Sequence, residues 1–296
     1  MKKLIVIAGP TASGKTDLAI QIAQYFQTEI ISADSRQCYK ELKIGVAKPS
    51  DEQLNKVHHY FINSHSILDD VSVGLYEKYA LDSLQEIFIK NDIAVCVGGT
   101  GLYIKALCEG IDTMPPIDEK IIDQIELNYS TKGIKWLQDE IKIKDELFFH
   151  EGEMSNPARM IRALSFMEGI GESILQFRKK EIKKRDFEIH SYAIEIERGI
   201  LYQRINDRVD FMIKIGLEDE VRSLLNYQTL KSLNTVGYSE LFKYFNHEFN
   251  LNEAIEKIKQ HSRNYAKRQI TWFKNQGNYK IISAEAIFKE IIDRHQ

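Results

Sequence analysis

Residues 4–16, LIVIAGPTASGKT, join a short apolar run to a glycine-rich turn. Residues 9–16 match G-x-x-x-x-G-K-[ST], the pattern of a phosphate-binding loop, or P-loop. The apolar run predicts a buried parallel strand, and the fourfold spacing of Leu18, Ile22 and Phe26 predicts a helix directly after the turn. Between a strand and a helix, backbone N–H groups and the helix N-terminus converge on phosphate oxygens. The sequence therefore predicts an N-terminal diphosphate site.

The residue types of this loop suit phosphate chemistry. Glycines let the loop wrap closely around the anion, Lys15 supplies a full positive charge, and the Thr16 hydroxyl supplies a ligand for Mg²⁺. The pattern alone fits ATP, GTP or another diphosphate equally well. The predicted diphosphate-binding residues are Gly9, Pro10, Thr11, Ala12, Ser13, Gly14, Lys15 and Thr16.

Apolar runs and helical patterns alternate after the P-loop. Further strands are predicted over residues 29–33, 93–97 and 190–196, with helices over 75–90 and 100–107. Such alternation predicts parallel strand pairing with right-handed crossovers. We therefore expect the α/β class, with a P-loop NTPase-like parallel sheet as the core.

A helical insertion is expected within this core. Met114-Pro115-Pro116 interrupts the alternation, and only helical patterns follow it, to about residue 185. We expect residues 1–113 and 186–296 to form the core and residues 114–185 to form the insertion. The helices expected after the prolines cover residues 117–129, 134–141 and 157–167 in the insertion and 198–225 and 251–273 in the core.

Composition and charge limit the classes of protein to which the chain can belong. With 43% hydrophobic and 28% charged residues, the 296-residue chain is typical of a soluble globular protein. Its net charge of −3 counts against a nucleic-acid binder, but two basic runs, residues 159–185 and 257–280, are either RNA-binding surfaces or solvated helix faces. The isolated cysteines, Cys38, Cys96 and Cys108, favour a reducing, cytoplasmic setting. We expect a monomer with no signal peptide and no membrane span.

Three polar loops are predicted at one edge of the sheet, where the carboxyl ends of parallel strands meet. They are the P-loop, Asp34-Ser35-Arg36-Gln37, and Gly98-Gly99-Thr100-Gly101. Alone, Asp34 is also consistent with a turn cap and Thr100 with a helix cap. The strand before Gly98 lacks the terminal carboxylate with which kinases and ATP hydrolases position Mg²⁺, which disfavours a nucleotide kinase or a nucleotide-switched binding protein as the alternative.

Together these motifs resemble those of the tRNA dimethylallyltransferases, the isopentenyl-diphosphate:tRNA transferases. The resemblance spans nearly the whole chain, and the ordered combination of DSRQ, GGTGLY and AKRQITW makes it specific. The resembling segments are GPTASGKT (9–16), DSRQCYK (34–40), AKP (47–49), VHH (57–59), VGGTGLYIKAL (97–107), NPARMIRAL (156–164), RINDRVDFMIKIGLEDEV (204–221), TVGYSE (235–240) and AKRQITWF (266–273).

The resemblance implies transfer of a dimethylallyl group from dimethylallyl diphosphate to the exocyclic amine of the adenosine 3′ to the anticodon in tRNA. Lys15, Arg208 and Mg²⁺ held by Thr16 would then neutralise the leaving diphosphate, and Asp34 would accept the amine proton. A related transferase acting on free adenine nucleotides is a further alternative. The resemblance implies tRNA contacts from both the core and the insertion. The implied contacts are Asp34, Ser35, Arg36, Gln37, Thr100, Gly101, Arg159, Arg162, Lys267 and Arg268.

Overall fold

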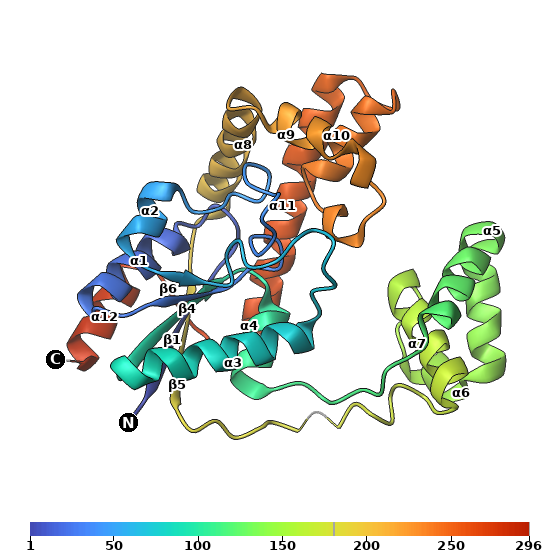
Figure 1. Cartoon of the computed structure of the whole chain (residues 1–296), viewed down its shortest axis with the longest axis horizontal. Helices are drawn as coiled ribbons and strands as arrows, with labels where there is room; N and C mark the ends of the chain where they lie inside the picture. The colour runs from blue at the N-terminus through green and yellow to red at the C-terminus, as the bar shows by residue number, and fades with distance from the viewer. Residues whose placement is uncertain (180, 296) are drawn as a thin grey trace. The chain divides into compact units, whose positions relative to one another are not determined.

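The computed structural model describes residues 1–179 and 181–295 of the chain. It divides into two compact units, one of residues 1–109 and 184–296 and one of residues 110–183. We call them the core unit and the inserted unit. Figure 1 shows strands flanked by helices in the core unit and helices as the regular elements of the inserted unit.

The core unit contains a six-stranded sheet in the order β3-β2-β4-β1-β5-β6, within the described part of the chain. Every pairing in it is parallel, and Leu4 of the central strand lies opposite Ala94 on one side and Ile189 on the other. The prediction of a parallel P-loop-type sheet is thereby confirmed. The strands are β1 (Lys3–Ala8), β2 (Ile30–Ala33), β3 (His59–Tyr60), β4 (Ile93–Gly98), β5 (Glu188–Ile194) and β6 (Lys280–Ile282).

The helices of the core unit largely follow the predicted pattern. The helix predicted over residues 198–225 is wrong in one respect, because Gly216, with a φ of 103°, turns the chain and separates α8 from α9. The helices are α1 (Lys15–Tyr25), α2 (Asp51–Lys56), α3 (Val73–Lys90), α4 (Gly101–Glu109), α8 (Arg198–Lys214), α9 (Leu217–Ser223), α10 (Tyr238–Phe245), α11 (Leu251–Asn275) and α12 (Ala284–His295), with short 3-10 helices η1 (Leu225–Tyr227) and η2 (Lys231–Leu233).

Side chains of β1 alternate between two hydrophobic clusters. Leu4 and Val6 pack in the cluster that includes residues of α3 and α4, whereas Ile5 and Ile7 pack in the cluster that includes residues of α1 and α12. All four are fully buried. Burying a side chain of this size stabilises a fold by ~1.5–3 kcal/mol. The loop after β1 is therefore held at the end of a strand packed on both faces.

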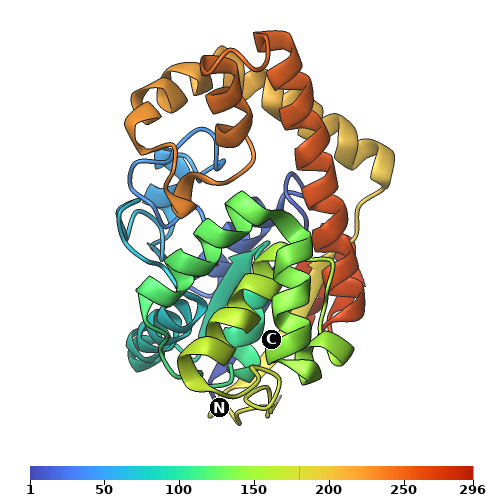
Figure 2. The same ribbon diagram turned by 90° about the vertical axis from the view of Figure 1, so that its right-hand side faces the viewer.

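Helix α11 spans 25 residues and appears as one long helix in both Figure 1 and Figure 2. Its contacts include residues of α8, α10 and α4. The buried positions Ala266, Gln269 and Phe273 lie on its inner face, and the residues between them are partly or fully exposed. The inner face of α11 therefore carries one buried polar side chain, Gln269, among apolar ones.

The inserted unit has a hydrophobic core of its own. Its elements are α5 (Glu119–Lys144), interrupted at Gly133 with a φ of 76°, α6 (Glu146–Glu151) and α7 (Pro157–Ile170). Leu137, Phe148 and Met160 are among the residues buried between them. Asn156 caps α7, since its side chain accepts from the Arg159 N–H at 3.3 Å. The helical character predicted for this region is thus observed in its described residues.

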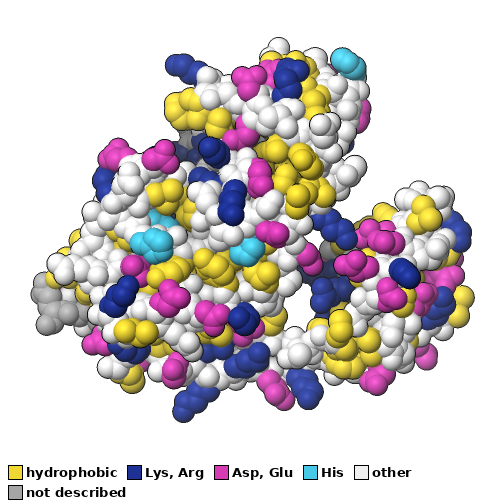
Figure 3. Space-filling view, in the orientation of Figure 1, with side chains coloured by type: hydrophobic (Ala, Val, Ile, Leu, Met, Phe, Trp, Pro, Cys, Tyr) yellow, Lys and Arg dark blue, Asp and Glu magenta, His cyan; other side chains and the backbone are white. Residues whose placement is uncertain are grey.

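Acidic and basic side chains are interspersed over the face of the molecule seen in Figure 3. This mixture agrees with a net charge of only −3. Among the described residues, no helix has the length and apolar composition needed to cross a bilayer.

Candidate active site

The P-loop curls tightly between β1 and α1. Ala12 and Gly14 adopt positive φ angles of 64° and 85°, and the Ser13 N–H donates to the Pro10 carbonyl at 3.3 Å. The Lys15 ammonium also donates to that carbonyl, at 3.2 Å. The buried Ser13 hydroxyl has no hydrogen-bond partner among the residues that the structure describes. Since buried polar groups are normally satisfied, this hydroxyl indicates a loop shaped around a polar ligand.

Two cationic side chains are partly desolvated at this loop. Burial lowers the pKa of Lys15 to about 8, with the nearby Asp34 charge opposing the shift and the Arg208 charge adding to it. Arg208, from α8, donates to the Thr11 hydroxyl at 3.1 Å. Burial also lowers the pKa of Arg208. Burial disfavours the charged forms of both side chains, and an anion placed between them would stabilise those charged forms. The geometry therefore suits phosphate.

Asp34 lies at the carboxyl end of β2. Its Oδ1 accepts from the backbone N–H groups of Arg36 and Gln37, at 2.9 and 3.3 Å, which fixes the carboxylate in a turn. Its Oδ2 makes no hydrogen bond within residues 1–179 and 181–295. One oxygen is thus structural, as a turn cap would be, and the other is available to a ligand.

Thr100 joins the loop after β4 to the loop after β2. Its hydroxyl accepts from the Ser35 N–H at 3.1 Å and lies 3.4 Å from the Ser35 hydroxyl. Burial and the Asp34 charge raise the pKa of Tyr265, on α11, to about 12, and the contact of Tyr265 with Thr100 opposes this. Asp34, Thr100 and Tyr265 therefore share one polar surface beside the P-loop.

Gln269 of α11 connects the same loops, and reasoning from the sequence missed it. Its carbonyl accepts from the Thr11 N–H and its amide donates to the Gly99 carbonyl, each at 2.9 Å. A Cβ at position 99 would lie 2.2 Å from the Gln269 amide nitrogen, so glycine permits this approach. The signal in the sequence was a glutamine at the core-facing spacing set by Ala266 and Phe273, since a buried amide requires partners.

The two predicted contacts in the inserted unit, Arg159 and Arg162, lie on α7. Arg159 and Arg162 are exposed, and Arg159 pairs with Glu153. Burial lowers the pKa of Arg178, and the charges of Arg162 and Arg159 lower it further, whereas the charge of Asp112 opposes the shift. Such a like-charge cluster is typical of a surface that binds an anion.

Arg185, which the first basic run includes, has a different role. It forms an ion pair of 2.9 Å with Glu77, and both side chains are only 10% exposed. It also donates to the Leu107 and Ala106 carbonyls, at 2.9 and 2.8 Å. The expectation that Arg185 belongs to an RNA-binding surface or a solvated helix face is therefore corrected. Arg185 holds α3 and α4 to the segment before β5.

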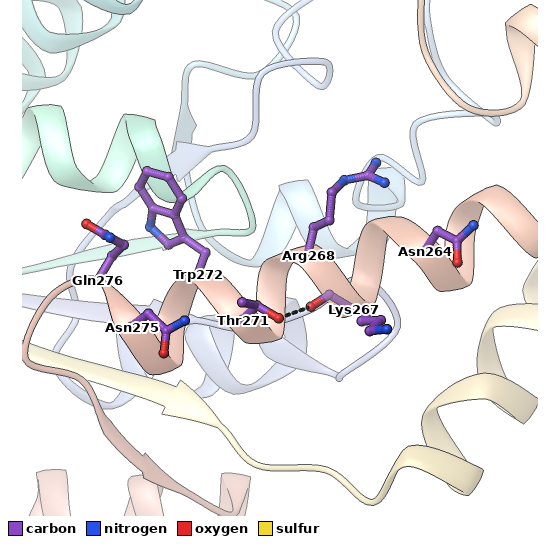
Figure 4. Close-up of a pocket in the computed structure, with 7 residues that line it drawn as sticks. All are labelled: Asn264, Lys267, Arg268, Thr271, Trp272, Asn275 and Gln276. Atoms are coloured by element: carbon purple, nitrogen blue, oxygen red, sulfur yellow. Dashed lines mark hydrogen bonds between the residues drawn. The ribbon is translucent and has the colours of Figure 1, made fainter. Parts of the chain in front are cut away.

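A hollow of about 490 Å³ lies along the C-terminal half of α11. Lys267 and Arg268 are exposed there, and Figure 4 shows Arg268 and Trp272 rising from the same side of the helix. Cations, amides and an indole ring suit phosphates and bases of a nucleic acid. The lining residues are Asn264, Lys267, Arg268, Thr271, Trp272, Asn275 and Gln276.

Comparison with known proteins identifies the family of the chain. The model of the family described as IPP transferase matches residues 37–276 of the chain. The tRNA dimethylallyltransferase of Christiangramia forsetii is 43% identical over 290 residues, which cover 98% of this chain and 96% of the relative. The chain belongs to this family, the tRNA dimethylallyltransferases. A second relative, tRNA dimethylallyltransferase 1 of Bacteroides thetaiotaomicron, is 43% identical over 93% of this chain and 89% of its own length.

Solved structures of the family share the fold. The full-length tRNA isopentenylpyrophosphate transferase from Bacillus halodurans is similar with a TM-score of 0.73 and 31% identity, over 100% of this chain and 96% of that one. A eukaryotic dimethylallyltransferase acting on tRNA is similar with a TM-score of 0.76 and 25% identity, over 96% of this chain and 74% of that one. The resemblance noted in the sequence is thereby confirmed over both units.

Proposed function

We propose that this family member transfers a dimethylallyl group from dimethylallyl diphosphate to the exocyclic amine of the adenosine 3′ to the anticodon in tRNA, releasing diphosphate. The observation that carries the proposal is the juxtaposition of an anion cradle, Lys15 with Arg208, and a carboxylate, Asp34, whose charge acts on Lys15. A diphosphate leaving group and an amine that must lose a proton require these two features side by side.

The proposed chemistry moves one group and one proton. The bond between the allylic carbon and the diphosphate oxygen breaks, and its electron pair leaves with the diphosphate. The adenine nitrogen bonds to that carbon, and its proton passes to Oδ2 of Asp34. The P-loop N–H groups, Lys15 and Arg208 neutralise the charge that develops on the leaving group. Thr100 orients the loop that carries Asp34.

Magnesium fits the P-loop on the chemistry of its donors. The Thr16 hydroxyl, partly exposed on the first turn of α1, makes no hydrogen bond to any described residue. Mg²⁺ is usually held by one or two protein oxygens together with substrate phosphates and water. When bound, it would neutralise diphosphate charge, and Thr16 would hold it.

The tRNA would be held by polar groups of both units. In the core unit, Arg36 donates to the Asn234 carbonyl at 3.2 Å, which fixes the loop that we expect to surround the displaced base. We propose that the exposed cations of this set, Arg159, Arg162, Lys267 and Arg268, contact RNA phosphates. The proposed tRNA-binding residues are Asp34, Ser35, Arg36, Gln37, Thr100, Gly101, Arg159, Arg162, Lys267 and Arg268, and we propose a cytoplasmic monomer.

The test is incubation with dimethylallyl diphosphate, Mg²⁺ and unmodified tRNA, followed by mass spectrometry of the nucleosides. We expect a prenylated adenosine, and we expect Asp34→Ala to lower turnover by roughly 10²-fold or more with little change in diphosphate affinity. AMP as acceptor is the comparison that separates tRNA from free nucleotides. Phosphate release from ATP without prenyl transfer would replace the proposal with a nucleotide-hydrolysing function.

A further inference from the structure

One carboxylate of the core unit, outside the groups assigned to chemistry, collects an unusual number of donors. Glu220, on α9, accepts from the backbone N–H groups of Lys43, Ile44 and Gly45 at 3.2, 2.8 and 3.1 Å. It also accepts from the Tyr238 hydroxyl at 2.5 Å. Hydrogen bonds to an ionised acceptor are stronger than neutral ones, so this single side chain anchors three consecutive residues of a loop.

The anchored loop, residues 43–48, is compact. The Ala47 N–H donates to the Ile44 carbonyl at 3.0 Å, and the Lys48 N–H donates to the Lys43 carbonyl at 3.3 Å. A Cβ at Gly45 would lie 2.5 Å from the Tyr238 ring, so this position requires glycine for close approach. Burial and the Glu220 charge raise the pKa of Tyr238, which keeps its hydroxyl a donor. The loop therefore has one conformation, set from α9 and α10.

This loop in turn holds Gln37 of the proposed RNA site. The Gln37 side-chain NH₂ donates to the carbonyls of Val46 and Ala47, at 3.2 and 3.0 Å. Two carbonyl acceptors on the nitrogen leave only the side-chain oxygen for other partners. That oxygen makes no hydrogen bond within the described ranges 1–179 and 181–295. Gln37 also follows Asp34 closely, since its backbone N–H donates to Asp34 Oδ1 at 3.3 Å.

We propose that Glu220 is a positioning residue: by anchoring the loop of residues 43–48, it fixes the Gln37 amide so that its oxygen accepts a hydrogen bond from an N–H or O–H group of the RNA beside the reacting adenosine. This inference rests on the proposed function and adds the polarity of one RNA contact. Glu220 acts through the loop and touches no substrate itself.

Glu220→Gln is the informative change, because it places an NH₂ group against backbone N–H donors and removes the charge. We expect the KM for tRNA to rise roughly tenfold, as for loss of one hydrogen bond, while the KM for dimethylallyl diphosphate changes less than about twofold. Gln37→Met should give the same rise. Because both changes remove one contact, the double variant should also show roughly tenfold and not a hundredfold.

Glu218→Gln is the matched control, since it removes the same group from the same helix at a partly exposed i,i+4 pair with Arg222. The Gln37 side-chain NH₂ signals in ¹⁵N NMR spectra should shift in Glu220→Gln and stay unchanged in Glu218→Gln, a readout independent of RNA. If Glu220→Gln does not fold, Tyr238→Phe, which removes one donor, should raise the KM for tRNA roughly threefold. Additive effects, or equal rises in both KM values, overturn the inference. An inactive wild-type protein with the predicted NMR shifts would instead refute the proposed function.

Discussion

Replacing Gln269 with alanine would cut the link between the P-loop and the loop after β4. The change leaves the buried Gly99 carbonyl and the partly exposed Thr11 N–H without the partners that they now have at 2.9 Å. An unsatisfied buried group costs ~1–3 kcal/mol. Water can reach Thr11 in part, so we expect a total loss of about 2–4 kcal/mol in the free energy of unfolding. For a chain of this size, that corresponds to a fall in Tm of roughly 3–6 °C.

Binding of diphosphate should weaken as well, because Thr11 also positions Arg208 through its hydroxyl. We expect roughly tenfold lower affinity for dimethylallyl diphosphate, measured by isothermal titration calorimetry beside thermal denaturation. Gln260→Ala, at an exposed position of the same helix, is the control. If Gln269→Ala melts and binds diphosphate as Gln260→Ala does, the bridge has no energetic importance and the reasoning is wrong.

Two further predictions concern charge. Because burial lowers the pKa of Lys15 to about 8, its cationic form is lost as pH rises through 8. Affinity for diphosphate should therefore be constant below pH ~7 and fall roughly tenfold by pH ~9. Lys15→Arg should remove this pH dependence. A flat profile in the unaltered protein would contradict the role of Lys15 in binding diphosphate. The double variant Lys267→Ala, Arg268→Ala should bind tRNA more weakly and reduce the slope of log K against log salt concentration by about 2. Its affinity for diphosphate should be retained. An unchanged slope would show that neither residue contacts the RNA.

The sheet and the P-loop were predictable because their signals are local. Leu4–Ala8 and Ile93–Val97 are continuous apolar runs, as strands buried on both faces are. The strands β3 and β6 span only two and three residues and carry no pattern to detect. The break between α8 and α9 depends on the positive φ of Gly216, and a single glycine within an otherwise helical pattern does not specify one.

The site was only partly predictable, for a related reason. Motif residues such as Lys15 and Asp34 can be identified from their residue type and their spacing in the sequence. Gln269 acts through partners 258 and 170 residues away in the sequence, and Glu220 acts through backbone groups 175–177 residues away. No local pattern encodes such contacts. Their importance follows only when the fold brings α11 to the P-loop and α9 to the loop of residues 43–48.

The roles of the P-loop and of Asp34 can be seen in a crystal structure with an unreactive analogue of dimethylallyl diphosphate and a tRNA anticodon stem-loop. We expect the diphosphate within the loop of residues 9–16, in contact with Lys15 and Arg208, and Oδ2 of Asp34 within hydrogen-bonding distance of the adenine amine. A diphosphate bound elsewhere, or an Asp34 carboxylate turned away from an adenine that occupies the pocket, would contradict it.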